Sequence, residues 1–204
     1  MRCLVTAGPT IEPIDEVRWL TNHSTGRLGC DLSDALSRAG HHVTLLLSQV
    51  ALHMPRSKKH RIIRFSTTRD LGGRLKEISA LKVKAVFHAA AVSDFCIEKQ
   101  LKGKIDSAKG ITLRLKPSPK LIRNLRKSFP DALIAGWKYE VSGNRKSALD
   151  SAKQQIKRCN TNLCVANGPA YGDGFGLVSD EVIHCVNDHS LFRLLIKNLA
   201  TSPR

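Results

Sequence analysis

Short apolar runs alternate along the chain with longer segments whose apolar residues recur at helical spacing. Residues 3–6, 43–47 and 83–91 are nearly continuous in apolar residues, a pattern typical of strands that are covered on both faces. Further strands are predicted at residues 62–65, 132–137, 163–167 and 182–186. Helices are predicted from residue 24 to 39, through residues 71–78, and at residues 119–127, 144–158 and 190–199.

The order of these elements predicts the fold class. Repeated strand-then-helix units require right-handed crossovers and build a parallel sheet. We therefore predict an α/β fold with a Rossmann-like, open, mostly parallel sheet and helices on both faces. The sequence contains no internal repeat, low-complexity tract or linker, so residues 1–204 are predicted to form a single nucleotide-binding domain.

Residues 102–116 follow a different pattern. Ile111, Leu113 and Leu115 alternate with Thr112 and Arg114, which is typical of a strand with one exposed face. We predict a protruding β arm in this segment. An exposed strand edge is usually covered by a partner, so we expect a homodimer with these three apolar side chains at or near the contact.

Ligands of open parallel sheets bind beyond the carboxyl ends of the strands, where the strand order reverses. Three predicted strands end in small or polar residues, at 6–10, 89–94 and 166–168. Ser24-Thr25-Gly26 begins the first helix, whose N-terminus can face an anion. The dinucleotide-binding glycine motif is missing after the first strand, because Gly26 and Gly29 come much later, and no P-loop motif is present. The spacing alone indicates only a phosphate-binding α/β domain.

The charge balance favours an anionic partner. The chain has 33 Lys and Arg residues against 17 Asp and Glu residues, which gives a formal net charge of +16. Nucleic acid, an acidic membrane surface and phosphorylated small molecules all fit this charge, as does a merely solvated basic surface. Because aromatic residues make up only 5% of the chain and no nucleic-acid-binding motif appears, a nucleic-acid partner is not favoured.

The apolar runs and the cysteines indicate the cellular compartment of the protein. The apolar runs are too short to cross a membrane and the N-terminus does not resemble a signal peptide, so we expect a cytoplasmic protein. The six cysteines lack the spacing of a zinc site, and several lie in apolar runs. We therefore expect reduced, structural thiols.

Five segments resemble the phosphopantothenate–cysteine ligase family, also called phosphopantothenoylcysteine synthetases. They are residues 6–10 (Thr-Ala-Gly-Pro-Thr), 17–26 (Val-Arg-Trp-Leu-Thr-Asn-His-Ser-Thr-Gly), 90–94 (Ala-Ala-Val-Ser-Asp), 103–107 (Gly-Lys-Ile-Asp-Ser) and 165–167 (Val-Ala-Asn). The resemblance covers nearly the whole chain in order. It implies amide formation between 4′-phosphopantothenate and cysteine in coenzyme A biosynthesis, through an acyl-nucleotide intermediate and with release of pyrophosphate.

The resemblance also implies site residues, which we carry over as expectations. Asn22, Lys104 and Arg18 are expected to be catalytic, with Arg18 steadying its loop or a phosphate. The expected nucleotide-binding residues are Gly8, Ala90, Ala91, Asp94 and Asn167. The expected substrate-binding residues are Asn22, Ser24 and Gly26. Asp94 is expected to hold Mg²⁺, which accompanies ATP or CTP as co-substrate, and no flavin is expected. The family resemblance further implies a dimer in which the arm crosses to the other subunit.

The match departs from the flavin-fused members of the family. They carry further lysines where this chain has Asp106-Ser107, and a different sequence at residues 137–140 (Trp-Lys-Tyr-Glu). At both places the chain is closer to the stand-alone eukaryotic-type ligases, which leaves the choice between ATP and CTP open. Two alternatives remain: a catalytically inactive homologue and a basic nucleic-acid-binding α/β protein. A nicotinamide-dependent reductase is disfavoured, because the second predicted strand ends in Ser48-Gln49 without an acidic residue for the ribose.

Overall fold

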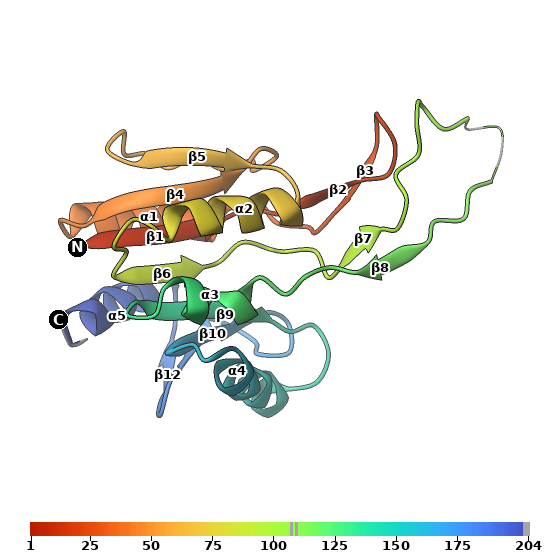
Figure 1. Cartoon of the computed structure of the whole chain (residues 1–204). Helices are drawn as coiled ribbons and strands as arrows, with labels where there is room; N and C mark the ends of the chain where they lie inside the picture. Colours follow the sequence, from red (N-terminus) through yellow and green to blue (C-terminus); the bar gives the residue numbers. More distant parts are fainter. Residues whose placement is uncertain (107, 109, 202–204) are drawn as a thin grey trace.

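The computed structural model of the chain describes residues 1–106, 108 and 110–201. Within these residues, one large sheet comprises β1 (Arg2–Ala7), β4 (His42–Ser48), β5 (Arg61–Phe65), β6 (Ala85–His88), β9 (Leu133–Tyr139), β10 (Leu163–Asn167), β11 (Phe175–Val178) and β12 (Val182–Cys185). Its order is β12-β11-β10-β9-β6-β1-β4-β5 (Figure 1). The strands from β10 to β5 are parallel, and β11 and β12 are antiparallel at one edge. The predicted open, mostly parallel sheet is confirmed.

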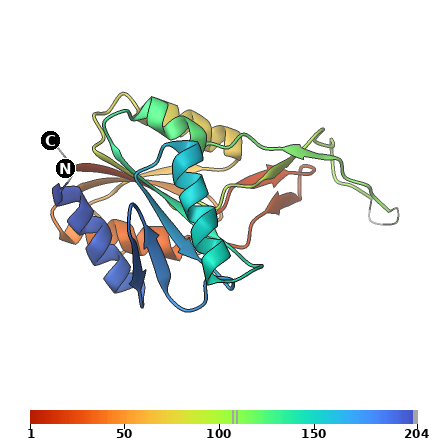
Figure 2. The same ribbon diagram turned by 90° about the horizontal axis from the view of Figure 1, so that it is seen from below.

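Helices cover both faces of this sheet, as predicted. They are α1 (Arg27–Arg38), α2 (Thr68–Ile78), α3 (Ile122–Ser128), α4 (Arg145–Cys159) and α5 (Asp188–Thr201). α1 and α5 pack on one face, while α2, α3 and α4 pack on the other. Figure 2 shows the α1–α5 pair and the α2–α3 pair on opposite sides of the sheet. None of the helices in the described part of the chain is long and apolar enough to cross a membrane.

The central strand β1 explains why its sequence run is apolar throughout. Cys3 and Val5 pack with α1 and α5, whereas Leu4 packs with α2 and α3. A strand that is buried on both faces needs apolar residues at successive positions rather than at alternate ones. Burial of this layer on both sides is the main source of stability for the sheet.

The strand order fixes where a ligand can bind. The chain starts at β1, builds outward through β4 to β5, and then returns to place β6 on the other side of β1. The order therefore reverses between β1 and β6. The carboxyl ends of these two strands lie at residues 8 and 89–91, where the connections diverge and leave room for a ligand.

Two predictions about the strands need correction. The segment predicted as a strand over residues 83–91 is a strand only at Ala85–His88, because the Ala90 N–H binds a side chain instead of a strand neighbour. The half-exposed strand expected over residues 102–116 is wrong for most of its length. Within the described residues of that segment, strand structure is confined to β8 (Leu115–Pro117), which pairs with β7 (Phe95–Ile97).

The arm protrudes from the sheet, as predicted (Figure 1). The alternation of its residues does not create a buried face. Ile111, Leu113 and Leu115 are 48%, 37% and 46% exposed, and the intervening polar residues are exposed too. Leu115 pairs with Ile97 of β7, and none of the three side chains belongs to the buried core of the described residues. Ser107, at which the sequence departs from the flavin-fused proteins, lies outside the described residues.

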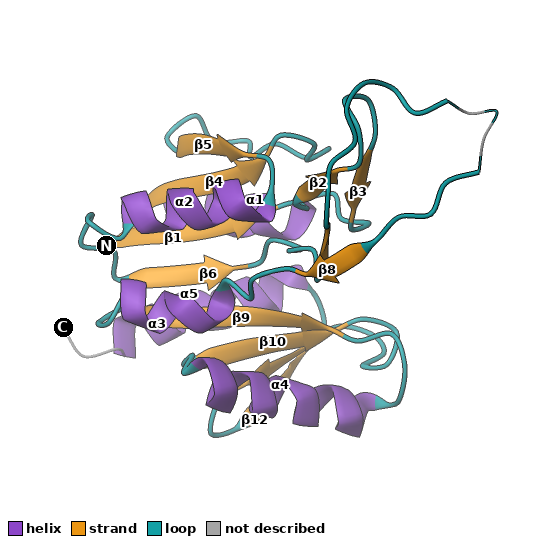
Figure 3. Cartoon of the chain, turned by 45° about the vertical axis from the view of Figure 1, so that its right-hand side comes forward, coloured by secondary structure: helices purple, strands orange, loops and turns teal. Residues whose placement is uncertain are grey.

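A second projection, absent from the prediction, lies beside the base of the arm (Figure 3). It is the hairpin of β2 (Ile11–Pro13) and β3 (Trp19–Thr21), inserted between β1 and α1. The Leu101 N–H of the arm donates to the Ile14 carbonyl of the hairpin, at 2.9 Å. The two projections are thus joined.

Candidate functional site

The ends of β1 and β6 form a continuous rim of main chain. Pro9 and Ala91 form a parallel bridge. The Ala91 N–H donates to the Gly8 carbonyl at 3.0 Å, and the Thr10 N–H donates to the Ala91 carbonyl at 3.2 Å. Three of the residues predicted to bind nucleotide, Gly8, Ala90 and Ala91, are therefore brought together at the reversal of the strand order.

Buried side chains hold this rim from below. The Thr6 hydroxyl accepts a hydrogen bond from the Ala90 N–H at 3.1 Å and lies 3.0 Å from His88 Nδ1. Burial lowers the pKa of His88 to about 4, so its ring is neutral near pH 7. Four residues after Thr6, the Thr10 hydroxyl accepts a hydrogen bond from the Ser93 N–H at 2.9 Å. Every one of these side chains is buried, so the rim is fixed before any ligand arrives.

Three glycines allow the start of α1 to touch the end of β1. Gly8 and Gly26 both have positive φ, at 85° and 79°. A methyl group on Gly26 would lie 3.3 Å from the Gly8 Cα, and one on Gly29 would lie 2.6 Å from the Ala7 Cβ. These are the tasks of a dinucleotide-binding glycine motif: a tight turn, close approach and helix–strand packing. Here the β2–β3 hairpin separates the first glycine from the other two, which explains why they come late in the sequence.

The N-terminus of α1 opens onto this rim. Gly26 caps the helix without a side-chain hydrogen bond, and the first turn has no acidic residue. Arg27 is the first residue of the helix. The Arg27 N–H donates to Thr25 Oγ1 at 3.3 Å. The following N–H groups of the first turn and the helix dipole favour a negatively charged ligand.

Asn22 and Ser24 line a small cavity beside the rim. The cavity has a volume of about 280 Å³ and is lined by Pro9, Trp19, Thr21, Asn22, His23, Ser24, Thr25, Val50 and Leu52. Asn22 Nδ2 donates to the carbonyl oxygens of Ala91 and Val92, at 3.3 and 3.2 Å. Its amide group thus ties the hairpin to the rim. In this arrangement the side-chain oxygen, not the nitrogen, is left for a ligand.

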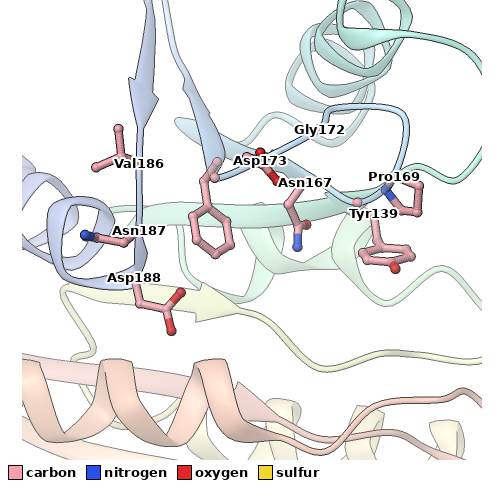
Figure 4. A pocket seen from close by; sticks show the side chains of 11 residues that line it. Tyr139, Asn167, Pro169, Gly172, Asp173, Val186, Asn187 and Asp188 are labelled. Atoms are coloured by element: carbon pink, nitrogen blue, oxygen red, sulfur yellow. The ribbon is translucent and has the colours of Figure 1, made fainter.

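Asn167 lies in a different, larger cavity of about 630 Å³, formed where β10 ends. Figure 4 shows Tyr139, Asn167 and Asp188 around it. Asp188, at the start of α5, forms an ion pair with Arg27, in which a guanidinium nitrogen lies 2.6 Å from Asp188 Oδ2. Because Arg27 directly follows Gly26, this ion pair joins the wall of the larger cavity to the N-terminus of α1. The two cavities thus flank that helix end.

Arg18 and Lys104 lie on the two projections. Arg18 forms an ion pair with Asp15 at 2.6 Å and donates to the Ile105 carbonyl at 3.3 and 3.4 Å. Lys104, the residue before Ile105, is exposed. Burial alone would raise the pKa of the Asp15 carboxyl. Hydrogen bonds from the N–H groups of Ile105, Val17 and Arg18 and from the Arg18 side chain outweigh this effect and lower the pKa to about 2. Asp15 is therefore ionised throughout the neutral range.

Comparison with known proteins decides the family. The model of the DNA/pantothenate metabolism flavoprotein C-terminal domain matches residues 1–198. The chain belongs to this family. A relative, the coenzyme A biosynthesis bifunctional protein CoaBC of Thermococcus kodakarensis, is 32% identical over 182 residues, which are 89% of this chain and 44% of that protein. The chain thus spans less than half the length of this relative.

Solved structures of the family share the fold. The DNA/pantothenate metabolism flavoprotein from Streptococcus pneumoniae is 26% identical, with a TM-score of 0.87 and 98% of each chain covered. A Cab2 variant in complex with phosphopantothenate-cysteine is 20% identical, with a TM-score of 0.81; the match covers 98% of this chain and 85% of that one. At this identity the second likeness concerns the fold alone.

Asp94, the predicted metal ligand, lies before β7 and forms an ion pair with Lys120. Its side chain is 69% exposed. In the part of the chain that the structure describes, no three His, Cys, Asp or Glu side chains gather into a metal-binding group. Mg²⁺ is commonly held by one or two carboxylates together with substrate phosphates and water. A single accessible carboxylate fits that mode, in which the nucleotide brings most of the ligands.

The cysteines agree with the expected structural role. All six are free thiols, and all but Cys96 are buried. Burial raises the pKa of Cys3 and Cys30 to about 11 and that of Cys164 to about 12, so these thiols stay protonated at neutral pH. Protonated, buried thiols behave as small apolar side chains.

Sequence reasoning assigned no role to the residues that hold the site in place. Thr6 and His88 are polar residues inside apolar runs, and Asp15 stands between two apolar segments of the hairpin. A polar residue in a buried run must find a hydrogen-bond partner, which is a signal for a support of this kind. The sequence does not show which partner it finds, because the bonds to Ala90 and Ile105 span more than eighty residues.

Proposed function

We propose that this chain is a phosphopantothenate–cysteine ligase. The observation that carries the proposal is the contact between Gly8 and Gly26, which opens the N-terminus of α1 onto the rim between two cavities. A reaction between a phosphorylated acid and a nucleoside triphosphate needs two neighbouring sites with an anion-binding group between them. The names of the relative and of the Cab2 complex support this reading.

The first step joins the two phosphorylated substrates. The carboxylate of 4′-phosphopantothenate attacks the α-phosphorus of ATP or CTP, and the bond to pyrophosphate breaks. In our proposal, the larger cavity with Asn167 takes the nucleotide, and the main chain at Gly8, Ala90 and Ala91 faces its phosphates. The smaller cavity, which is lined by Asn22 and Ser24 and lies next to the Gly26 cap of α1, takes the organic acid.

Mg²⁺, when bound with the nucleotide, supplies positive charge to the phosphoryl oxygens. Asp94 is the residue that we expect to hold it. Asp94 would have to exchange its ion pair with Lys120 for the metal, and both side chains are exposed enough to do so without disturbing the core.

The second step forms the amide. The amino group of cysteine attacks the acyl carbon, the bond to the nucleotide oxygen breaks, and the nucleoside monophosphate leaves with the electron pair. Negative charge develops on the acyl oxygen and on the leaving phosphate. We assign the Lys104 ammonium to this charge, because a lysine on an exposed loop is a flexible point charge. Arg18 is expected to steady the loops rather than to react.

The proposal includes a homodimer and a cytoplasmic location. The exposed apolar side chains of the arm, Ile111, Leu113 and Leu115, support a contact with a second copy, since neighbouring exposed apolar side chains commonly mark an interaction surface. The net charge of +16 suits a site for several phosphate groups.

A pyrophosphate-release assay tests the function. Purified protein is supplied with 4′-phosphopantothenate, cysteine, Mg²⁺, and ATP or CTP in turn. The proposal predicts pyrophosphate release that requires the phosphopantothenate, together with formation of the cysteine amide. Absence of turnover with both nucleotides would support the inactive homologue. Retention on DNA that falls steeply with salt, without turnover, would support the nucleic-acid-binding alternative.

A further inference from the structure

The turn of the β2–β3 hairpin is built around one buried carboxylate, Asp15. The Asp15 side chain has no exposed surface. Its two oxygens have separate tasks. Oδ1 accepts from the N–H groups of Val17 and Arg18, at 2.8 and 2.6 Å, which closes the turn. Oδ2 accepts from the Arg18 guanidinium at 2.6 Å and from the Ile105 N–H at 3.1 Å, which reaches the arm.

These bonds fix the main chain on both sides of Lys104. After Lys104, the Ile105 N–H binds Asp15 and the Ile105 carbonyl binds Arg18. Before Lys104, the Gly103 carbonyl accepts from the Glu16 N–H at 3.3 Å. Lys104 itself is exposed. The hairpin therefore fixes where the side chain of Lys104 begins and leaves its ammonium free to move.

The same hairpin also carries Asn22. Thr21, the last residue of β3, donates its hydroxyl to the Thr10 carbonyl at 2.8 Å, and Asn22 donates to the carbonyls of Ala91 and Val92. One end of the hairpin is thus bonded to the rim and the other end to the arm. A rigid element of this kind sets the position of one group relative to the other.

We propose that Asp15 is a positioning residue that, with Arg18, holds Lys104 at a set place relative to the rim. This inference rests on the role proposed above for Lys104. It assigns the guanidinium of Arg18 to the Asp15 carboxylate and the Ile105 carbonyl, not to a substrate phosphate. Misplacing a catalytic group by about 1 Å can cost on the order of 10²-fold in rate.

Asp15→Asn separates the two tasks of the carboxylate. The asparagine oxygen can still accept from Val17 and Arg18 and close the turn. Its NH₂ group then faces two other donors, the Arg18 guanidinium and the Ile105 N–H, so the bonds to the arm are lost. Glu16→Gln is the matched control: it also removes one negative charge from the turn, but its exposed side chain takes no part in these bonds. Arg18→Lys is a second variant, because an ammonium cannot hold Asp15 and Ile105 as a guanidinium does.

The test is a single-turnover measurement with labelled nucleotide. For Asp15→Asn and Arg18→Lys we expect decay of the acyl-nucleotide with cysteine to slow by about 10-fold to 10²-fold. Its formation should change by less than about threefold, and Glu16→Gln should match the parent chain. In a Lys104→Gln background, Asp15→Asn should add no further slowing, because it acts through Lys104. Equal slowing of both steps, or additive effects in the double variant, would overturn the proposal.

Limited digestion with trypsin separates this inference from the proposed function. Without substrates, Asp15→Asn should accelerate cleavage after Lys102 and Lys104 at least fivefold, with unchanged circular dichroism, while Glu16→Gln should not. If the parent chain forms no acyl-nucleotide, the proposed function fails, but faster cleavage of the variant still demonstrates that Asp15 holds the arm. Unchanged cleavage in both Asp15→Asn and Arg18→Lys would show that these residues do not hold the arm, whatever the activity.

Discussion

The rim between β1 and β6 and the arm that carries Lys104 are held in place in different ways. The rim has main-chain bonds between neighbouring strand ends and the buried hydroxyls of Thr6 and Thr10 below it. The described part of the arm, beyond the β7–β8 pairing, is joined to the body through the turn of the β2–β3 hairpin, at Ile14, Asp15, Glu16 and Arg18. One region is part of the core, and the other is attached to it.

This difference matches the needs of the two proposed steps. Charge on transferring phosphoryl groups is best stabilised by donors that are already in place, because they need no reorganisation during the reaction. The N-terminus of α1, which opens onto the rim, provides such donors. A cation that acts only after the anhydride has formed can instead arrive on a loop.

Asn22→Asp should reduce turnover by about 10²-fold to 10³-fold, on the scale of one lost electrostatic contact in a preorganised site. The substitution puts a carboxylate oxygen against the carbonyls of Ala91 and Val92, and it adds negative charge beside the phosphates. Because Asn22 is exposed, the melting temperature should change little. Steady-state kinetics together with thermal denaturation provide the check. Turnover equal to that of the parent chain would contradict the role assigned to Asn22.

Gly8→Ala should destabilise the rim by about 2–5 kcal/mol, because a positive φ is unfavourable for alanine and the core is overpacked. The new methyl group would lie 2.7 Å from the Ser48 Cβ. Gly40→Ala is the matched control, since Gly40 has nearly the same φ but no atom within 4 Å of the added carbon. It should cost only about 1 kcal/mol. Urea denaturation of both variants measures the difference, and equal costs would contradict a tightly packed rim.

Stability should fall as the pH is lowered from about 6.5 to 4. Burial lowers the pKa of His88 to about 4 in the folded chain, while the unfolded chain binds the proton near its ordinary pKa of 6.5. The unfolded state therefore binds more protons in this window. The expected loss is about 3 kcal/mol. In His88→Leu this part of the pH dependence should disappear, and its persistence in urea denaturation curves would show that another group causes it.

Leu113→Asp should weaken the proposed dimer by about 10-fold, the equivalent of one lost apolar contact in each copy. The free energy of unfolding of the single chain should change little, since Leu113 lies on the protruding arm, outside the buried core of the described residues. Light scattering across a range of concentrations measures the effect, with exposed Leu52 changed to Asp as the control. A parent chain that is fully active as a monomer at micromolar concentration would contradict the dimer.

The sequence was informative where local pattern decides the structure. Helical spacing and strand runs predicted most of the strands and helices along the chain, though not β11, and the small residues at 8 and 89–91 indicated the ligand-binding edge. The lack of strand structure over most of the arm could not be predicted. The alternation of Ile111, Leu113 and Leu115 with polar residues shows only that one face could be buried, not what would bury it. The hairpin of short strands also gave no clear periodicity.

The candidate site was predictable in its parts but not in its connections. Family motifs pointed to Asn22 and Lys104, yet the direction of the Asn22 amide and the bonds of Asp15 depend on contacts between distant segments. The separated glycines are a clear example. Gly8, Gly26 and Gly29 meet only because the inserted hairpin folds away from the sheet.

Rapid quench of Lys104→Gln with α-labelled nucleotide tests the division between the rim and the arm most directly. We expect pyrophosphate and the acyl-nucleotide to form at nearly the parental rate. The intermediate should then accumulate, with its cysteine-dependent decay slowed by about 10²-fold to 10³-fold. If pyrophosphate release fails instead, while preformed acyl-nucleotide is still consumed by cysteine, Lys104 belongs to the first step and the division is wrong.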